Sequence, residues 1–176
     1  MSTEIDVFEF TRGARSAEGR IALVRLERLA SLVSDPVGDL DWRLDGWRER
    51  DAAGHERLRL HLRVSGSVVM RCGRCLGPAR LPLAVDRGFR LAASEGEAEK
   101  WDLDDEESDA LVASRKFDTL ALVEDEAILA LPPVANHAEC ARPAAAPGAA
   151  PSPRTAEDAP RRPFAELAKL NRKPPP

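Results

Sequence analysis

The chain of 176 residues has the length of one ordinary domain with room for a tail. Hydrophobic residues make up 43% and charged residues 32%, which supports a packed core and excludes disorder along the whole chain. The net charge of −4 gives no overall attraction to phosphate, and 5% aromatic residues with no Tyr argue against a stacking surface for single-stranded nucleic acid. Any contact with nucleic acid must therefore use a local patch or a partner protein.

Neither a membrane segment nor a secretion signal is indicated. No apolar run approaches the roughly 20 residues that cross a bilayer. The chain begins Met-Ser-Thr-Glu-Ile-Asp, which is acidic where a secretory signal is basic and then apolar. Three cysteines are too few, and odd in number, for a disulfide scaffold. These features predict a soluble, cytoplasmic protein.

The first half of the chain predicts an antiparallel sheet. Residues 21–33 are apolar with a mixed period and suggest a strand that runs into a short helix. Residues 58–64 alternate apolar and polar side chains, as in a strand with one buried and one solvated face. The Ser-Gly-Ser at 65–67 predicts either a turn or a bulge, after which the strand resumes at 68–70. Two short strands, 81–85 and 89–91, are predicted across Asp-Arg-Gly at 86–88.

Charge is distributed in blocks. Residues 48–90 hold ten arginines and four acids, a net charge of +6, whereas residues 94–126 hold thirteen acids and three basic residues, a net charge of −10. Such blocks either dock on each other, present separate faces to partners, or are solvated surfaces. If the basic block contacts RNA directly, the candidate contacts are Arg59, Arg63, Arg71 and Arg74.

The best predicted helix covers residues 119–131. Asp118 or Thr119 can cap its first amides, and the Pro-Pro pair at 132–133 ends it. The helix is expected to turn three acids outward as a candidate partner-binding face: Glu124, Asp125 and Glu126. Its apolar face is expected to hold Leu120, Val123, Ala127, Ile128 and Leu131.

The composition changes after residue 140. Residues 141–162 are rich in Pro and Ala and lack large apolar side chains, which predicts a disordered linker. Residues 163–176 predict a short helical motif whose apolar side chains, Phe164, Leu167 and Leu170, would bind a surface. We therefore expect an α+β domain over residues 1–140, built from an antiparallel β-sheet packed with one main amphipathic helix, followed by the linker and the motif.

Cysteine and histidine spacing raises a metal hypothesis. Cys72 and Cys75 form a Cys-x-x-Cys, and His137 and Cys140 form a His-x-x-Cys, which together supply the four soft ligands that tetrahedral zinc prefers. Two other interpretations stay open: a thiol oxidoreductase site of the Cys-x-x-Cys type, or reduced thiols that only hold a turn. The first is disfavoured because Leu-Gly-Pro at 76–78 breaks any helix after the cysteines.

Motifs of common enzymes are missing. The sequence has no glycine-rich phosphate loop, no Gly-x-Ser-x-Gly and no His-Glu-x-x-His. The acidic run at 101–108 lacks the spacing and the glycine of a calcium loop. The sequence therefore predicts a non-enzymatic protein.

Three segments together resemble the YceD family, the bacterial large ribosomal RNA subunit accumulation proteins. They are Val-Met-Arg-Cys-Gly-Arg-Cys-Leu at 69–76, the Val-Glu-Asp-Glu to Leu-Ala-Leu-Pro block within 117–132, and Pro-Phe-Ala-Glu-Leu-Ala-Lys-Leu at 163–170. Cys72 and Cys75 match the family's Cys-x-x-Cys position, and His137 with Cys140 matches the region of a His after the Leu-Pro.

The resemblance implies an accessory role in the synthesis, processing or stability of large-subunit (23S) ribosomal RNA. No catalytic residue comes with it. The expected partners are the rRNA maturation machinery or a ribosomal protein, reached through the acidic helix and the C-terminal motif. Two alternatives remain: direct binding of rRNA by the arginine-rich sheet face, and a Cys-x-x-Cys thiol oxidoreductase. No membrane and no small-molecule substrate are expected, and structural zinc is the one candidate cofactor.

Overall fold

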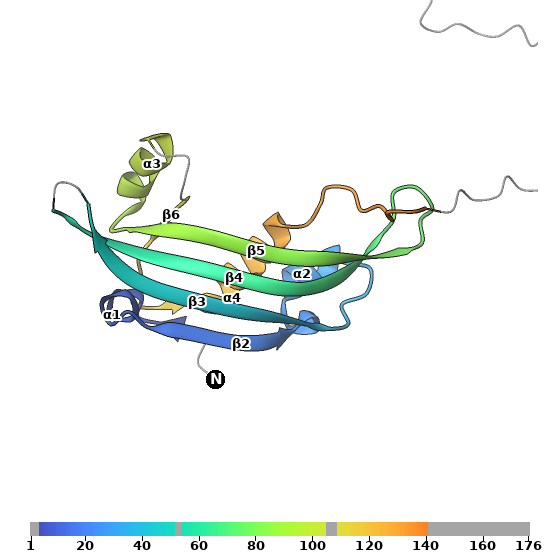
Figure 1. Ribbon diagram of the computed structural model, residues 1–176, viewed down its shortest axis with the longest axis horizontal. Coiled ribbons are helices and arrows are strands. Elements are labelled where there is room, and N and C mark those ends of the chain that lie inside the picture. The colour runs from blue at the N-terminus through green and yellow to red at the C-terminus, as the bar shows by residue number, and fades with distance from the viewer. Residues whose placement is uncertain (1–3, 52–53, 105–108, 141–176) are drawn as a thin grey trace, which may run out of the picture. The chain divides into compact units, whose positions relative to one another are not determined.

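A computed structural model describes residues 4–51, 54–104 and 109–140 of the chain (Figure 1). These residues belong to the first of two units, Met1–Ala141, into which the chain divides. The elements follow in this order: β1 Glu4–Ile5, α1 Val7–Arg12, β2 Ser16–Ala22, the 3₁₀ turn η1 Leu23–Arg25, α2 Glu27–Leu32, β3 Asp39–Arg50, β4 Glu56–Arg71, β5 Pro78–Ala92, α3 Glu95–Asp104, β6 Asp109–Val112, β7 Phe117–Asp118 and α4 Thr119–Leu129.

The main sheet has five strands in the order β2-β3-β4-β5-β6 within the described residues. The first four strands pair antiparallel, whereas β6 pairs parallel to β5. A separate two-stranded ribbon joins β1 to β7 just before α4. The predicted α+β class with an antiparallel sheet is confirmed, and the parallel edge strand β6 adds to it.

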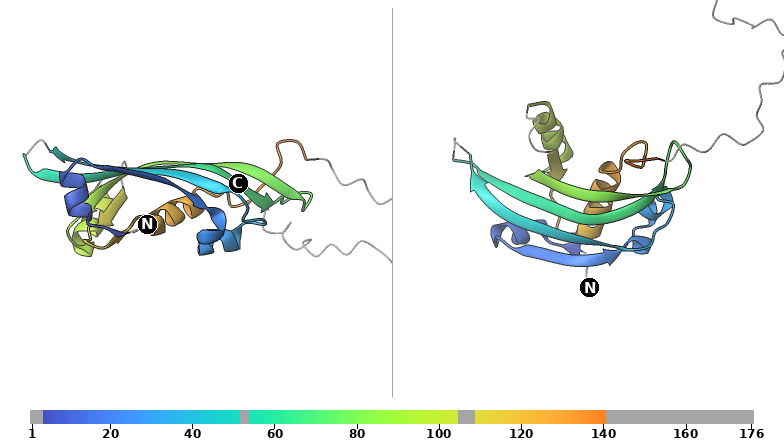
Figure 2. Two further views of the ribbon diagram at one scale, coloured as in Figure 1. Left: turned by 90° about the horizontal axis from the view of Figure 1, so that it is seen from below. Right: turned by 45° about the vertical axis from the view of Figure 1, so that its right-hand side comes forward.

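One face of the sheet is covered and the other is open to solvent. Alternate side chains of β4, among them Leu60, Leu62 and Val64, are at most 2% exposed. Helices α1, α2 and α4 lie together on this side of the sheet (Figure 2, left). The intervening residues of β4 point to the opposite face, where Arg59 and Arg63 reach solvent. The hydrophobic core is thus a single layer between the sheet and these helices.

Strand β4 runs without interruption, so the predicted turn or bulge at Ser65, Gly66 and Ser67 is wrong. These residues pair in unbroken register with Ala84, Leu83 and Pro82 of β5. The glycine serves close packing instead of a turn, because a Cβ at Gly66 would lie 2.5 Å from Cδ2 of Leu40 on β3.

Strand β5 is likewise one strand where two were predicted. Asp86, Arg87 and Gly88 continue the ladder with β4, and the side chains of the first two contact residues of the neighbouring strands. Asp86 Oδ1 lies 2.6 Å from Nε2 of His61, and Arg87 pairs with Asp109 on β6. Pairing with the neighbouring strands therefore overrides the local turn preference of these residues.

Helix α3 was not predicted and is held to the sheet by its Trp101. The guanidinium carbons of Arg57 on β4 and Arg90 on β5 lie 5.1 and 5.4 Å from the centre of a Trp101 ring. Both distances are within the range of cation–π attraction. The acidic block at residues 94–126 thus begins with a helix whose Trp101 packs on two arginines of the basic block.

Helix α4 confirms the main helix predicted from the sequence, although it ends at Leu129 instead of residue 131. The Asp118 side chain caps it by accepting from the N–H groups of Leu120 and Ala121 at 2.9 and 3.2 Å. Its predicted apolar face is confirmed, because Val123 and Ala127 are buried in the core and the other three predicted residues pack against it: Leu120, Ile128 and Leu131. Leu122 is buried as well.

The prediction that all three acids of α4 point outward is wrong for two of them. Glu124 is 8% exposed and Glu126 is 7% exposed, and Asp125 remains accessible. Burial raises the pKa of Glu126, whose carboxylate lies 4.0 Å from the Arg87 guanidinium. Of this trio only Asp125 is available to a partner.

Glu124 fastens α4 to the start of α2. One of its carboxylate oxygens accepts from the N–H groups of Arg28 and Leu29 at 2.7 and 3.2 Å, and the other accepts from Nε of Arg28 at 2.9 Å. Burial alone would raise the pKa of Glu124, but these donors hold it below its ordinary value. The acid therefore caps a helix that is 96 residues away in the sequence.

Residues 141–176 lie outside the described part of the chain. The expected linker at 141–162 and the expected motif at 163–176 therefore stay predictions.

Replacing Glu124 with Gln should lower the free energy of unfolding at pH 7 by about 1–3 kcal/mol, because buried N–H groups lose a charged acceptor. Asp125→Asn is the matched control and should cost only about 0–1 kcal/mol, since its ion pair with Arg28 is exposed. Urea unfolding of both variants measures the difference.

The same contact has a defined pH dependence. Because the pKa of Glu124 is lowered on folding, its stabilisation is present above its unfolded pKa of about 4.3 and is lost as the pH falls through the folded value. The difference in free energy of unfolding between the parent chain and Glu124→Gln should therefore disappear at acidic pH. An equal gap at pH 7 and pH 3 would contradict the assignment.

Candidate metal centre

The turn between β4 and β5 carries the Cys-x-x-Cys. Cys72 directly follows β4, and its N–H donates to the carbonyl of Gly77 at 2.8 Å, while its carbonyl accepts from the N–H of Leu76 at 3.0 Å. Leu76 adopts a positive φ of 62°, which lets the chain reverse into β5. No helix begins at this turn, unlike in a thioredoxin-type site, where the first cysteine lies at a helix N-terminus.

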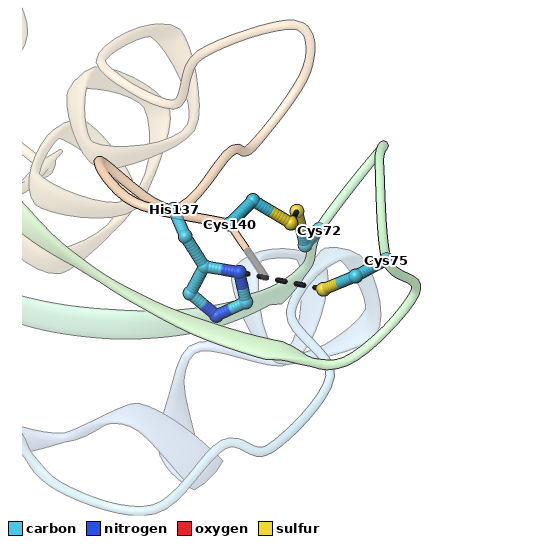
Figure 3. Close-up of side chains that lie close together, drawn as sticks. All are labelled: Cys72, Cys75, His137 and Cys140. Atoms are coloured by element: carbon cyan, nitrogen blue, oxygen red, sulfur yellow. Dashed lines mark hydrogen bonds between the residues drawn. The ribbon is translucent and has the colours of Figure 1, made fainter. Parts of the chain in front are cut away.

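The segment after α4 brings the second pair of ligands to this turn. The N–H of Gly73 donates to the carbonyl of Ala135 at 2.8 Å, and Ala135 is buried. A Cβ at Gly73 would lie 2.6 Å from Cγ1 of Val134, so a residue without a side chain is needed for this approach. His137 and Cys140 follow on the same segment and face the two cysteines of the turn (Figure 3).

The four predicted ligand residues lie close together in the structure. Their ligand atoms all lie within 4.8 Å of one another. Cys75 Sγ is 3.5 Å from Nδ1 of His137, and Cys72 Sγ is 3.9 Å from Sγ of Cys140 (Figure 3). Ligand atoms of a tetrahedral zinc with bonds of about 2.3 Å to sulfur are about 3.8 Å apart. The spacing of the cluster therefore matches the donor set and the size of such a site.

His137 is oriented by a hydrogen bond outside the cluster. Its Nε2 lies 2.8 Å from the carbonyl oxygen of Pro78, the first residue of β5. A carbonyl only accepts, so Nε2 carries the proton and Nδ1 presents its lone pair to the thiols. Metal-binding histidines are commonly held in this way by a second hydrogen bond.

The surroundings of Cys72 favour its thiolate. Hydrogen bonds from the backbone N–H groups of Cys75 and Arg74, and then of His137, lower the pKa of Cys72 to about 5. A side-chain hydrogen bond with Cys75, and after it burial, raise the pKa of Cys140 to about 11. The bond to the Pro78 carbonyl raises the pKa of His137. A cation at the centre would relieve the repulsion among the thiolates.

The four arginines proposed as RNA contacts differ in their surroundings. On the open face of the sheet, Arg59 pairs with Glu49 at 2.6 Å and Arg63 pairs with Asp45 at 2.7 Å. Among the described residues, Arg71 donates to the carbonyl of Leu76, at 3.3 Å. Arg71 and Arg74 are exposed, and no carboxylate of the described residues lies within ion-pair distance of either.

Arg80 joins these two arginines and was missed by the sequence analysis. It is exposed on β5 opposite Val69, so it is a diagonal cross-strand neighbour of Arg71, and its guanidinium donates to Ser67 Oγ at 3.1 Å. Its position could have been predicted if residues 78–92 had been assigned as one strand. We call Arg71, Arg74 and Arg80 the knuckle arginines.

The remaining candidates are buried, paired with an arginine, or outside the described residues. Glu124 and Glu126 are buried under the sheet, Asp125 pairs with Arg28 at 2.5 Å, and Phe164, Leu167 and Leu170 lie outside the described residues. In the described ranges, no helix is both long and apolar enough to cross a membrane.

Comparison with known proteins gives one result. Searches of curated proteins and of solved structures found no significant match. A family model described as large ribosomal RNA subunit accumulation protein YceD matches residues 60–171. This range is more than half of the chain and includes the Cys-x-x-Cys turn, α4 and the second pair of ligands. The chain belongs to the YceD family of large ribosomal RNA subunit accumulation proteins.

Proposed function

We propose that the chain is a non-enzymatic accessory factor that supports the synthesis, processing or stability of 23S ribosomal RNA. The observation that carries this proposal is the family match, whose description names large-subunit rRNA accumulation and whose range covers both halves of the cysteine–histidine cluster. The family supports a role in ribosome biogenesis, and the 23S target and the lack of catalysis are our proposal.

The contact with rRNA runs through the knuckle arginines. Phosphate binding is favoured where a cation is exposed and not already neutralised. Arg71, Arg74 and Arg80 satisfy both conditions against the described carboxylates, and they surround one turn at the end of the sheet. This local basic patch provides the attraction to phosphate that the chain as a whole, with its net negative charge, lacks.

The rest of the open face is less suited to RNA. Arg20 pairs with Asp41 at 2.7 Å, Arg43 lies 3.0 Å from both Glu18 and Asp45, and the pairs of Arg59 and Arg63 continue the pattern. Acids interleaved in this way cancel the field that would attract phosphate. We therefore favour the knuckle over the sheet face as the RNA-binding surface.

Structural zinc is the proposed cofactor, held by Cys72, Cys75, His137 and Cys140. Three sulfurs and one imidazole nitrogen fill a tetrahedral shell and leave no open position for a substrate, as in structural zinc sites. The ion would tie the segment after α4 to the turn that carries Arg74, so it would fix the position of this arginine.

Protein purified without an affinity tag should carry about one zinc per chain, because a closed site of four ligands survives dialysis. His137→Ala should lose the zinc and lower the thermal stability markedly. His61→Ala, on the exposed face of β4, is the matched control and should keep it. Elemental analysis and thermal denaturation measure both effects.

Two outcomes would end the zinc proposal. One is a stable, metal-free protein whose three thiols titrate freely. The other is a disulfide between Cys72 and a second cysteine in protein purified with reductant and without chelator.

Binding of 23S rRNA fragments should weaken steeply as salt rises, with each lost phosphate contact reducing the slope of log K against log salt by about 0.7–0.9. Arg74→Gln should lose one such contact. Arg63→Gln is the matched control, because Arg63 is already paired with Asp45. Fluorescence anisotropy across a salt series compares them, and identical slopes for the two variants would exclude the knuckle as the binding surface.

In the bacterium that encodes the chain, depletion should lower 23S rRNA relative to 16S rRNA. A copy with Arg71, Arg74 and Arg80 changed to Gln should restore the ratio less well than the parent, and a copy carrying Arg63→Gln should restore it fully. An unchanged 23S:16S ratio after depletion would contradict the proposed function. Full restoration by the triple variant would instead point to a protein partner.

A further inference from the structure

Strand β2 forms one edge of the main sheet and has no strand on its outer side within the described residues. It pairs only with β3 and borders the sheet opposite β6 (Figure 1). An exposed edge of seven residues is a template for another strand unless something covers it. The question is which strand would fit.

The hydrogen-bond pattern identifies the groups at the free edge. Arg15 accepts from Gly46 of β3, and Leu23 donates to Gly38, each at 2.9 Å. Both pairs follow the register in which Ser16 opposes Asp45. Hydrogen-bonded pairs alternate along an antiparallel ladder, so the odd residues of β2 bond to β3. The even residues, Ser16, Glu18, Arg20 and Ala22, therefore direct their N–H and C=O groups outward.

The sequence of this edge is complementary to itself. When two copies of β2 run antiparallel with Gly19 on the two-fold axis, Glu18 of each copy opposes Arg20 of the other. In the same register, Ala17 opposes Ile21, a small side chain against a large one. The even residues then form hydrogen-bonded pairs, with about eight backbone bonds across the junction.

Neighbouring registers of the two β2 strands are disfavoured by electrostatic repulsion. A shift of the axis to residue 18 or to residue 20 would place two like charges directly opposite each other. Both side chains are at the surface, where they can reach across while each keeps an ion pair within its own chain, because Glu18 is 71% exposed and Arg20 is 67% exposed. Charge thus selects one register, which is also the symmetric one.

A groove beside the edge supports association on the covered side of the sheet. It has a volume of about 380 Å³, and residues 17–21 of β2 line it together with Trp42 and Leu120. In the symmetric pairing, Ile21 of the second copy would lie on this side next to Ala17, and so add apolar surface at the mouth of the groove.

We propose that β2 is a homodimerisation edge, at which a second copy of this chain adds its own β2 antiparallel and joins the two sheets into one. Such an interface is isologous, because the same residues contribute from both copies. Seven residues bury less than a standard interface, so we expect a reversible dimer with a dissociation constant of about micromolar order.

A charge-reversal cycle on the full chain tests this inference by sedimentation equilibrium. Glu18→Arg and Arg20→Glu should each raise the dissociation constant by about tenfold or more, since each places like charges opposite each other twice per dimer. An equimolar mixture of the two variants should recover the dimer, because every opposing pair is then of opposite charge. Asp86→Arg, on the same face of β5, is the control and should leave the dimer unchanged.

Each variant also loses one exposed ion pair within its own chain, with Arg43 or Asp41, so circular dichroism is used to confirm that both are folded. A chain that stays monomeric at roughly a hundred times the expected dissociation constant would overturn the proposal. A dimer that is unaffected by both reversals would overturn it too, because association would then use another surface. Failure of the mixture to recover would exclude the predicted register.

Discussion

Residues 59–71 of β4 pair with residues 78–90 of β5 without a break, and this ladder fixes the place of the turn that joins them. The turn holds Cys72 and Cys75 at the end of the sheet, and it leaves the carbonyl of Pro78 where it can orient His137. A shift of one residue in the ladder would exchange the two faces of the strands. The cysteine–histidine cluster, the knuckle arginines and the core all depend on this register.

Because helices cover only one face of the sheet, the residues that stabilise the fold and the residues that are open to other molecules lie in different places. Helices on one face supply the core and bury Glu124, which links α4 to α2, so two of the three acids of α4 have structural roles. The open face carries charges that pair with one another along β2, β3 and β4. Cations without a described carboxylate partner remain at the turn, and uncovered backbone groups remain at β2. We propose that other molecules bind at these two places.

The sequence predicts the parts of the fold that depend on local patterns. Alternation in residues 58–64 identified β4, the cap at Asp118 identified α4, and ligand chemistry identified the four residues of the cluster. Residues 39–50 also alternate, with Leu40 and Leu44 inward, so β3 was detectable. The full length of β4 was missed because Gly66 suggests a turn. The residue at this position must instead be small, because the Leu40 side chain of β3 lies against it. The role of Glu124 was hidden for the same reason, since its partners are 96 residues distant.

The central proposal is that three sulfurs and one histidine nitrogen surround a single zinc ion. X-ray absorption at the zinc edge of the full chain measures this directly. The geometry predicts three sulfur neighbours at about 2.3 Å and one nitrogen neighbour at about 2.0 Å. A first shell with two or fewer sulfurs, or one made mainly of oxygen, would show that Cys72, Cys75, His137 and Cys140 do not form the site.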